Sequence, residues 1–197
     1  MSGAFRALSV LLVSAVLAGC GSSGPTIPKQ KLSKVVLQRN DLPRTLSAFF
    51  DGPLVSADVS PPRTDPSRFA RLGGWIARYH RAGSTKTTGP LVVASRVDLF
   101  KDSGGAKKDF DLYRTQLRRS AEIGGKIKNV HGLGAEALAL VQHQGTGPAS
   151  VVGFTVVWRE ANATAELDAT GFSARLFFAQ VVALAGKQDR RLRGAAR

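Results

Sequence analysis

The stretch LVVASRVDLFKDSGGAKKDFDLYRTQL, residues 91–117, changes its hydrophobic period midway and thereby decides the fold class. Apolar and polar side chains alternate along its first nine residues, which predicts a strand over Leu91–Leu99 with one buried face. From Ser103 onward the apolar residues are three or four apart, as on one stripe of a helix: Ala106, Phe110, Tyr113, Leu117 and Ala121. We therefore expect a helix over Ser103–Ile123, which Gly124-Gly125 ends.

The same two patterns recur on both sides of this stretch. Leu72–Arg81 also alternates, and the turn-rich loop AGSTKTTGP joins it to Leu91–Leu99, so these two strands should form a hairpin. The apolar run Ala174–Ala185 predicts a second helix, packed across the sheet and capped by Gly186. The other expected strands are Ala135–His143, Val151–Trp158 and Ala163–Thr170, with a turn at Glu160-Ala161-Asn162 and an additional short strand at Val35–Leu37.

These elements predict an α+β fold, in which an antiparallel sheet of five to six strands is built from hairpins and two main helices pack on one face. The chain is long enough for a single domain with its own core, and we expect this domain to cover residues 35–186. Residues 187–197 would then form a basic tail, which either is a solvated end or contacts anionic envelope material. The basic residues of this tail are Lys187, Arg190, Arg191, Arg193 and Arg197, with Asp189 as its single acid.

The N-terminus has the pattern of an export signal. Arg6 is the only charged residue before the apolar run Ala7–Gly19, which is too short to span a bilayer. The run ends in Leu17-Ala18-Gly19-Cys20, which resembles the lipobox of bacterial lipoproteins. This resemblance implies that Cys20 is lipidated with diacylglycerol and acyl chains such as palmitate, and that the signal peptide, residues 1–19, is cut off between Gly19 and Cys20. The alternatives are an ordinary secretory signal with a chance cysteine and a cytosolic protein with an apolar start, but lipidation also explains why an exported chain has a single cysteine.

The basic residues and the net positive charge indicate what kind of partner to expect. Residues 21–34 are rich in Gly and Ser and predict a flexible tether, in which Lys29, Lys31 and Lys34 would contact the membrane surface. Without Arg6 the formal charge is +13, which indicates either an anionic neighbour, such as lipid headgroups or envelope polyanions, or a basic surface with no specific partner. We expect no nucleic-acid partner, because an exported, membrane-tethered protein rarely meets nucleic acid.

Three stretches give the folded part a second resemblance: NDLP at Asn40–Pro43, GPLVVASRVDLFKDSGGAKKDFDLYR at Gly89–Arg114, and GLGAEA at Gly132–Ala137. Their layout, followed by a hairpin and a helix, resembles small actinobacterial surface lipoproteins and the extracellular sensor domains of some envelope serine/threonine kinases. It is also similar to the PsbP-like fold. These families are mostly binding or accessory modules, and the resemblance implies no catalytic residue in this chain.

One set of residues invites a catalytic interpretation. His80, Asp98 and Ser103 follow the chain order of a chymotrypsin-like triad, and Asp102-Ser103-Gly104-Gly105 is similar to the sequence around that family's nucleophile. Lys101, however, stands where the family has the glycine of its oxyanion loop, and only five residues separate Asp98 from Ser103. Because Ser103 opens the predicted helix, we interpret it as the N-cap. The sequence thus predicts no catalytic residue and no enzyme.

The other candidate sites have no specific spacing. The residues His80, His131, His143 and Glu136 lack the helical or paired spacing of a metal site, so we expect surface histidines, no metal and no cofactor. The pairs Gly132/Gly134 and Gly145/Gly147 are too short for phosphate loops and predict turns. Four aromatic residues could line a ligand pocket but at strand spacing are typical of a core: Trp75, Tyr79, Phe154 and Trp158.

The function expected from these observations is that of a lipid-anchored, non-enzymatic binding or accessory module on the outer face of the plasma membrane. The alternative is a carrier that holds a lipid or another apolar ligand between sheet and helix, and an envelope hydrolase is less well supported. A carrier should have an apolar cavity between sheet and helix, whereas an accessory module should be packed solid there. The sequence leaves the ligand, any protein partner and the oligomeric state open.

Overall fold

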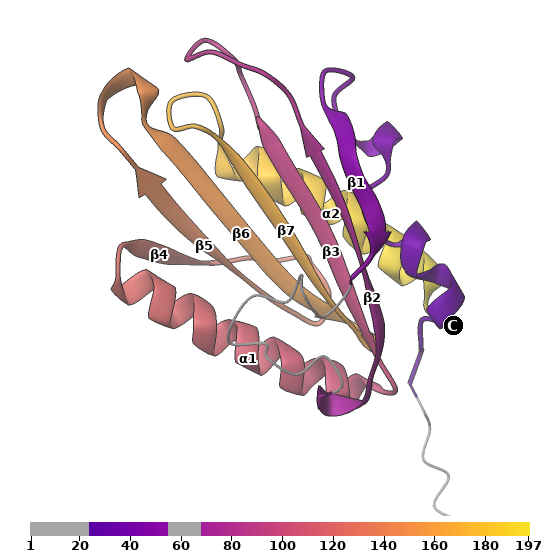
Figure 1. The fold of residues 1–197 in the computed structure, drawn as a ribbon. Helices are drawn as coiled ribbons and strands as arrows, with labels where there is room; N and C mark the ends of the chain where they lie inside the picture. Colours follow the sequence, from indigo (N-terminus) through magenta and orange to yellow (C-terminus); the bar gives the residue numbers. More distant parts are fainter. Residues whose placement is uncertain (1–23, 55–67) are drawn as a thin grey trace, which may run out of the picture.

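A computed structural model describes residues 24–54 and 68–197 of the chain (Figure 1). The predicted signal peptide, its cleavage site and the lipidated Cys20 lie outside the described residues. Two short 3₁₀ helices, η1 and η2, precede the sheet, and two single turns, η4 and η5, lie in connections. The bounds are η1 Lys29–Lys34, η2 Arg39–Asp41, β1 Ser47–Pro53, η4 Arg68–Ala70, β2 Arg71–His80, β3 Val92–Phe100, α1 Ser103–Glu122, β4 Gly125–Asn129, β5 Glu136–Gln144, η5 Gly147–Ala149, β6 Val151–Glu160, β7 Ala163–Phe172 and α2 Phe178–Ala195.

The strands form one antiparallel sheet in the order β1-β2-β3-β7-β6-β5-β4, so the α+β class is confirmed. The sheet has seven strands, and the expectation of five to six was wrong because both edge strands went unrecognised. Six of the seven residues of β1 are exposed, and a bulge between Ala48 and Phe50 interrupts its register. In β4 four of the five residues are exposed. Edge strands of this kind bury no continuous face, so they lack the alternation that marks a strand in a sequence.

The two main helices cover opposite faces of the sheet, which corrects the expectation that both pack on one face (Figure 1). α1 packs its stripe of Phe110, Tyr113 and Leu117 on Leu138, Leu140 and Val157. α2 packs on the other face, where successive strands contribute Ala77, Val97, Leu167, Val156 and Ala139 to the main core. Hydrophobic periodicity identifies a helix and its buried stripe, but it does not tell which side of a sheet the helix covers.

The segment expected to be a flexible tether belongs to the core from Ile27 onward. Ile27 and Leu32 are 1% and 6% exposed, and η1 lies within this segment. The folded domain therefore begins before Val35. Val35–Leu37 is fully buried but is not a strand, because the Leu37 amide donates to the Ser95 side chain and not to a neighbouring strand.

α2 is much longer than predicted and takes up the expected basic tail. The helix runs from Phe178 through Gly186 to Ala195, whereas the expected helix was Ala174–Ala185 with Gly186 as its cap. Residues three or four apart continue its buried stripe beyond Gly186: Gln188, Leu192 and Ala195. The high charge of residues 187–197 hid this stripe, because two of its buried positions are the polar residues Gln188 and Asp189.

The start of α1 also differs in one detail. The helix begins at Ser103, as expected, but Asp102 and not Ser103 is its N-cap. The Asp102 carboxylate accepts a hydrogen bond of 2.9 Å from the Gly105 amide. The cap therefore precedes the first helical residue by one position, as capping geometry requires.

Candidate functional site

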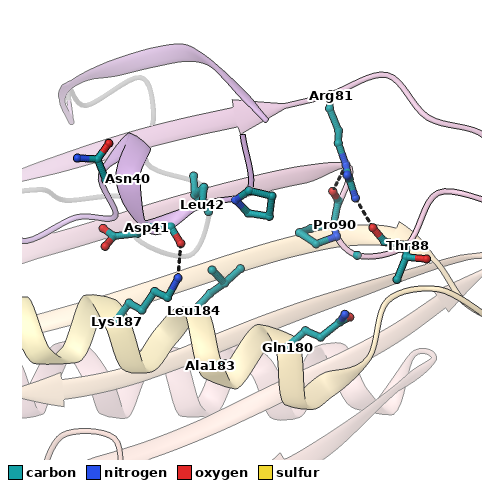
Figure 2. A pocket seen from close by; sticks show the side chains of 12 residues that line it. Asn40, Asp41, Leu42, Arg81, Thr88, Pro90, Gln180, Ala183, Leu184 and Lys187 are labelled. Carbon is teal, nitrogen blue, oxygen red and sulfur yellow. Dashed lines mark hydrogen bonds between the residues drawn. The ribbon is translucent and has the colours of Figure 1, made fainter. Parts of the chain in front are cut away.

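A groove of about 580 Å³ lies between α2, the segment before β1 and the β2–β3 loop (Figure 2). The NDLP segment, Asn40–Pro43, forms one wall, and Arg81 and Thr88–Pro90 form the end. α2 supplies the other wall through one face of the helix, because its lining residues are spaced i, i+3, i+4 and i+7: Gln180, Ala183, Leu184 and Lys187. Segments about 140 residues apart in the chain thus meet around one hollow.

The middle of the groove is apolar. Leu42 faces Ala183 and Leu184 across it, Pro43 lines the same wall as Leu42, and Pro90 closes the end. Leu42 and Leu184 are largely buried because they also pack in the main core, so the core holds their side chains in place at the floor of the groove. Such a surface binds an apolar group by removing it from water.

Cationic side chains stand at both ends of this apolar middle. Arg81 is held by three oxygen atoms: Nε donates to Pro90 O at 2.8 Å, Nη1 donates to Thr45 Oγ1 at 2.9 Å, and Nη2 donates to Thr88 O. At the other end Lys187 Nζ donates to Asp41 O at 2.5 Å. These hydrogen bonds of the two cations go to neutral oxygen atoms and not to carboxylates, so both side chains add positive charge to the lining.

Asp41 is the acidic residue of the lining, and its carboxylate is already engaged. Oδ2 accepts from the Gln38 amide at 2.7 Å and from Arg191 Nε at 2.9 Å. A second hollow of about 420 Å³ continues from the groove along α2, where Arg190 and Arg191 join Asn40, Asp41 and Lys187. The groove and this hollow together have an excess of positive charge beside an apolar surface. This combination suits a ligand with an apolar body and an anionic group.

Several residues of this groove stand out in the sequence, but nothing there predicts that they lie together. Asn40–Pro43 was noted only for the family resemblance, while Lys187, Arg190 and Arg191 were assigned to a tail. Gln180, Ala183 and Leu184 were not singled out. These three residues lie within the predicted helix Ala174–Ala185, and only Lys187 lies beyond it. Their partners across the groove come from a segment without any hydrophobic period, so no local pattern links the two walls.

The triad-like residues are far apart. His80 pairs with Val92 at one end of β3, whereas Asp98 lies six residues further along that strand, about 20 Å away. The Asp98 carboxylate is 1% exposed and forms ion pairs with Arg71 at 2.5 Å and Arg96 at 2.8 Å. Ser103 is an exposed first residue of α1. Their positions exclude a joint proton relay.

The four residues considered for a metal site are not all brought together, because His131 and Glu136 line one hollow of about 340 Å³ while His80 and His143 do not line it. Glu136 and His143 stand seven residues apart on β5, about 23 Å. Glu136 forms ion pairs with Arg159 at 2.7 Å and Arg114 at 3.6 Å, and His131 lies exposed in the loop after β4. Within residues 24–54 and 68–197, no three His, Cys, Asp or Glu side chains are grouped as metal ligands would be.

Aromatic side chains fill the space between the sheet and α2. Trp158, Tyr79 and Phe154 are 0%, 2% and 5% exposed in the main core, which confirms the core interpretation for these three. Trp75 is partly buried, and its Nε1 donates to Asp51 Oδ1 at 2.6 Å. A ligand bound between sheet and α2 would have to displace core side chains such as Trp158 and Leu37.

The expected turn glycines Gly132, Gly134, Gly145 and Gly147 all have positive φ angles.

A group of charged residues lies on the opposite face, under and beside α1. Tyr113 of α1 donates to the Glu166 carboxylate, and Arg96 approaches Glu166 at 4.0 Å. Next to them, Asp168 accepts a hydrogen bond of 2.6 Å from Thr155. Burial, reinforced by the negative charge of Glu166, raises the pKa of Asp168 well above its ordinary value. The cluster joins β3, β6, β7 and α1, and its groups face one another.

The lysines expected at the membrane surface lie on η1. Lys29, Lys31 and Lys34 are all exposed, while Leu32 between them points into the core. In the described part of the chain neither α1 nor α2 is long and apolar enough to cross a bilayer.

Among the comparisons with known proteins, a solved structure with a similar fold supports the observed architecture. No protein-family profile matches the chain, and no curated protein matches its sequence. Its fold is similar to that of the extracellular domain of PknH from Mycobacterium tuberculosis, with a TM-score of 0.62 over 86% of this chain and 98% of that one. The sequence identity is 12%, so the likeness concerns the fold. At the level of the fold, the expected resemblance to the extracellular domains of envelope kinases is confirmed, because the α+β architecture of the chain is similar to that of this one extracellular kinase domain.

Proposed function

We propose that the chain is a lipid-anchored, non-enzymatic binding module on the outer face of the plasma membrane, and that it binds an anionic amphiphile in the groove along α2. The groove carries this proposal, because its apolar middle lies between Arg81 and Lys187, whose charges are not neutralised by the carboxylate of Asp41. The fold of an extracellular domain supports a location outside the membrane. The separation of His80, Asp98 and Ser103 supports binding over catalysis.

The carrier alternative receives less support. A carrier shelters its ligand from water, but the groove is an open hollow, and the interface between the sheet and α2 is filled by buried side chains such as Trp158, Leu37 and Leu46. The groove is large enough for a small amphiphile or for one end of a longer one. We therefore favour a module that presents its ligand, or the ligand-bound surface, to a partner.

The groove can be tested with 1-anilinonaphthalene-8-sulfonate, which has an aromatic body and one anionic group. Ala183 is an exposed lining residue, so Ala183→Trp should fill the groove while leaving the core intact. We expect this variant to bind the probe at least tenfold more weakly, as measured by fluorescence titration. Ala149→Trp is the control, because Ala149 is exposed in η5 and does not line the groove, so this variant should bind like the wild type. Equal binding by both variants would contradict the proposal.

The charge requirement is tested separately at Arg190, which is exposed beside the second hollow. Arg190→Glu should weaken binding of the sulfonate and leave binding of an uncharged probe such as N-phenyl-1-naphthylamine unchanged. Arg119→Glu changes the net charge equally on α1, on the other face of the sheet, and serves as the control. If both variants weaken binding to the same extent, net charge and not the groove attracts the probe.

The lipid anchor is tested at Cys20. Cys20→Ala should leave the domain folded but either release it into the soluble fraction or leave the signal peptide uncleaved, which immunoblots of fractionated cells distinguish. Metabolic labelling with an alkyne fatty acid should mark the wild type and not the variant. Normal processing and membrane retention of the variant would disprove lipidation at Cys20.

A further inference from the structure

The place where the described chain enters the fold is fixed by hydrogen bonds. Thr26 N donates to Arg197 O at 2.9 Å, and Arg197 N donates to Thr26 O at 3.2 Å. The next residue, Ile27, is 1% exposed, and its amide donates to Asn162 Oδ1 at 2.6 Å. Asn162 lies in the β6–β7 turn, and its Nδ2 donates to Phe100 O at 2.7 Å. One end of the domain, the entry end, therefore carries Thr26, Arg197, the β6–β7 turn and the end of β3 (Figure 1).

The groove lies toward the other end of the strands. Arg81 and Pro90, which close it, flank the β2–β3 loop, and the Arg81 amide donates to Leu91 O just before β3 begins. β3 joins this loop to the entry end through nine residues, which span about 30 Å. The chain itself follows the same path, from Ile27 at the entry end past Leu37, bonded to Ser95 in the middle of β3, to Pro43 in the groove.

Exposed cations gather at the entry end. They are Lys29, Lys31 and Lys34 of η1, Lys101 directly after β3, and Arg197. Carboxylates of the same region are engaged within the domain. Asp189 pairs with Arg193 at 2.8 Å, Glu160 approaches Arg193 at 3.7 Å, and Asp102 caps α1. The entry end thus presents lysines whose charge attracts an anionic surface.

We infer that the entry end is a docking surface for an anionic lipid bilayer and that the groove opens on the side of the domain away from that bilayer. This inference rests on the proposed anchor at Cys20. Cys20 precedes Thr26 by six residues, which reach at most about 21 Å when fully extended. This reach is shorter than β3, so the anchor holds the entry end near the headgroups while the lysines of η1 orient the domain. The ligand of the groove then comes from the space outside the membrane or from a partner there.

The orientation can be measured on the lipidated protein because Cys20 is its only cysteine and the lipid blocks it. Gln30→Cys places a single free thiol on η1, and Ala82→Cys places one in the β2–β3 loop; both positions are exposed. Each variant is labelled with a fluorophore and reconstituted into vesicles that contain lipids with a nitroxide on the headgroup. We expect strong quenching at position 30 and weak quenching at position 82. Equal quenching at the two positions would overturn the inference, because the domain would then lie on its side or tumble freely.

Electrostatic docking is tested by varying lipid and protein charge. Quenching at position 30 should increase when phosphatidylglycerol is added to phosphatidylcholine, and this increase should disappear at high salt. A lysine near an anionic surface contributes about 1 kcal/mol, so reversal of Lys29, Lys31 and Lys34 to Glu should reduce the ratio of docked to undocked protein at least a hundredfold. The matched control reverses Lys86, Arg119 and Lys126, which are exposed away from the entry end. An equal loss in both triple variants, or none in the first, would contradict docking through η1.

A failed anchor is recognised independently. If Cys20 is not lipidated, protein without an introduced cysteine accepts the fluorophore and is washed from vesicles by salt. In that case the two label positions are compared in a Cys20→Ser background on anionic vesicles. Preferential quenching at position 30 would then support the docking surface without the anchor, and its loss would disprove the surface itself.

Discussion

Ser95 and Gln188 share a hydrogen bond of 2.8 Å in the middle of the interface between the sheet and α2, although 93 residues separate them in the chain. Ser95 Oγ donates to Gln188 Oε1 and accepts from the Leu37 amide at 2.8 Å. Gln188 Nε2 in turn donates to Arg96 O at 2.9 Å. Ser95 and Gln188 are both fully buried, so this small polar network joins the N-terminal segment, β3 and α2 within an apolar core.

Ser95→Ala removes a single oxygen atom but should clearly lower the free energy of unfolding. The variant leaves the Leu37 amide and Oε1 of Gln188 without their hydrogen-bond partner, and an unsatisfied buried polar group costs about 1–3 kcal/mol. We expect a loss of this size in the free energy of unfolding, measured by urea denaturation. Ser47→Ala on exposed β1 is the control and should change stability by less than about 0.5 kcal/mol. A similar effect of both changes would show that the network does not join the segments.

The N-cap of α1 gives a second comparison between adjacent residues. Asp102→Ala removes the acceptor for the Gly105 amide and should lower stability by about 1 kcal/mol, within the range known for N-caps. Ser103→Ala should have a much smaller effect, because Ser103 is exposed and already helical. Thermal unfolding followed by circular dichroism measures both. The reverse order would favour the cap that the sequence alone suggested.

How much of the fold the sequence predicts depends on whether a segment buries a regular face. β2, β3, β5, β6 and β7 bury at least one face along much of their length, and all five were recognised within a few residues. β1 and β4 are exposed edges, so nothing in their composition distinguishes them from loops. The assignment of residues 24–34 to a tether failed for a related reason: only Ile27 and Leu32 are buried there, too few to establish a period.

The candidate site was less predictable than the fold. Each wall of the groove has a recognisable sequence, NDLP on one side and one face of α2 on the other, but their contact depends on the path of residues 27–46 across the sheet. Hydrogen bonds to single side chains, such as that from Leu37 to Ser95, fix this path. Contacts of this kind between distant residues leave no local pattern in one sequence.

The C-terminal half of α2 should contribute to stability as a core element does. Leu192 is 0% exposed, so Leu192→Ala should lower the free energy of unfolding by about 2–5 kcal/mol, as in other cores. Arg190 lies two residues before it and is exposed, and Arg190→Ala should change stability by less than about 0.5 kcal/mol. Chemical denaturation of the two variants distinguishes a packed helix from a solvated basic tail, which would tolerate both changes equally.

Asp168 should make the domain less stable as the pH rises above the ordinary titration range of carboxyl groups. Burial, with Glu166 as the next cause, raises its pKa well above the ordinary value of 3.8. Between these two pKa values the folded chain keeps a proton that the unfolded chain has lost, so the free energy of unfolding falls as pH increases through this window. Asp111 affects stability in a different pH range. The hydrogen bond from Lys107 lowers the pKa of Asp111, so its contribution to the free energy of unfolding is lost only when the pH falls below 3.8.

Asp168→Asn tests this linkage because the amide oxygen can still accept the hydrogen bond from Thr155 while the charge is removed. The variant should be more stable than the wild type at neutral pH, and the difference should shrink as acid protonates Asp168 in the folded wild type. Glu160, whose pKa burial also raises, gives a slope of the same sign that remains in the variant. Urea denaturation at closely spaced pH values measures both curves. A variant that is less stable at neutral pH, or that differs from the wild type equally at every pH, would show that the ionised Asp168 carboxylate is well accommodated beside Glu166.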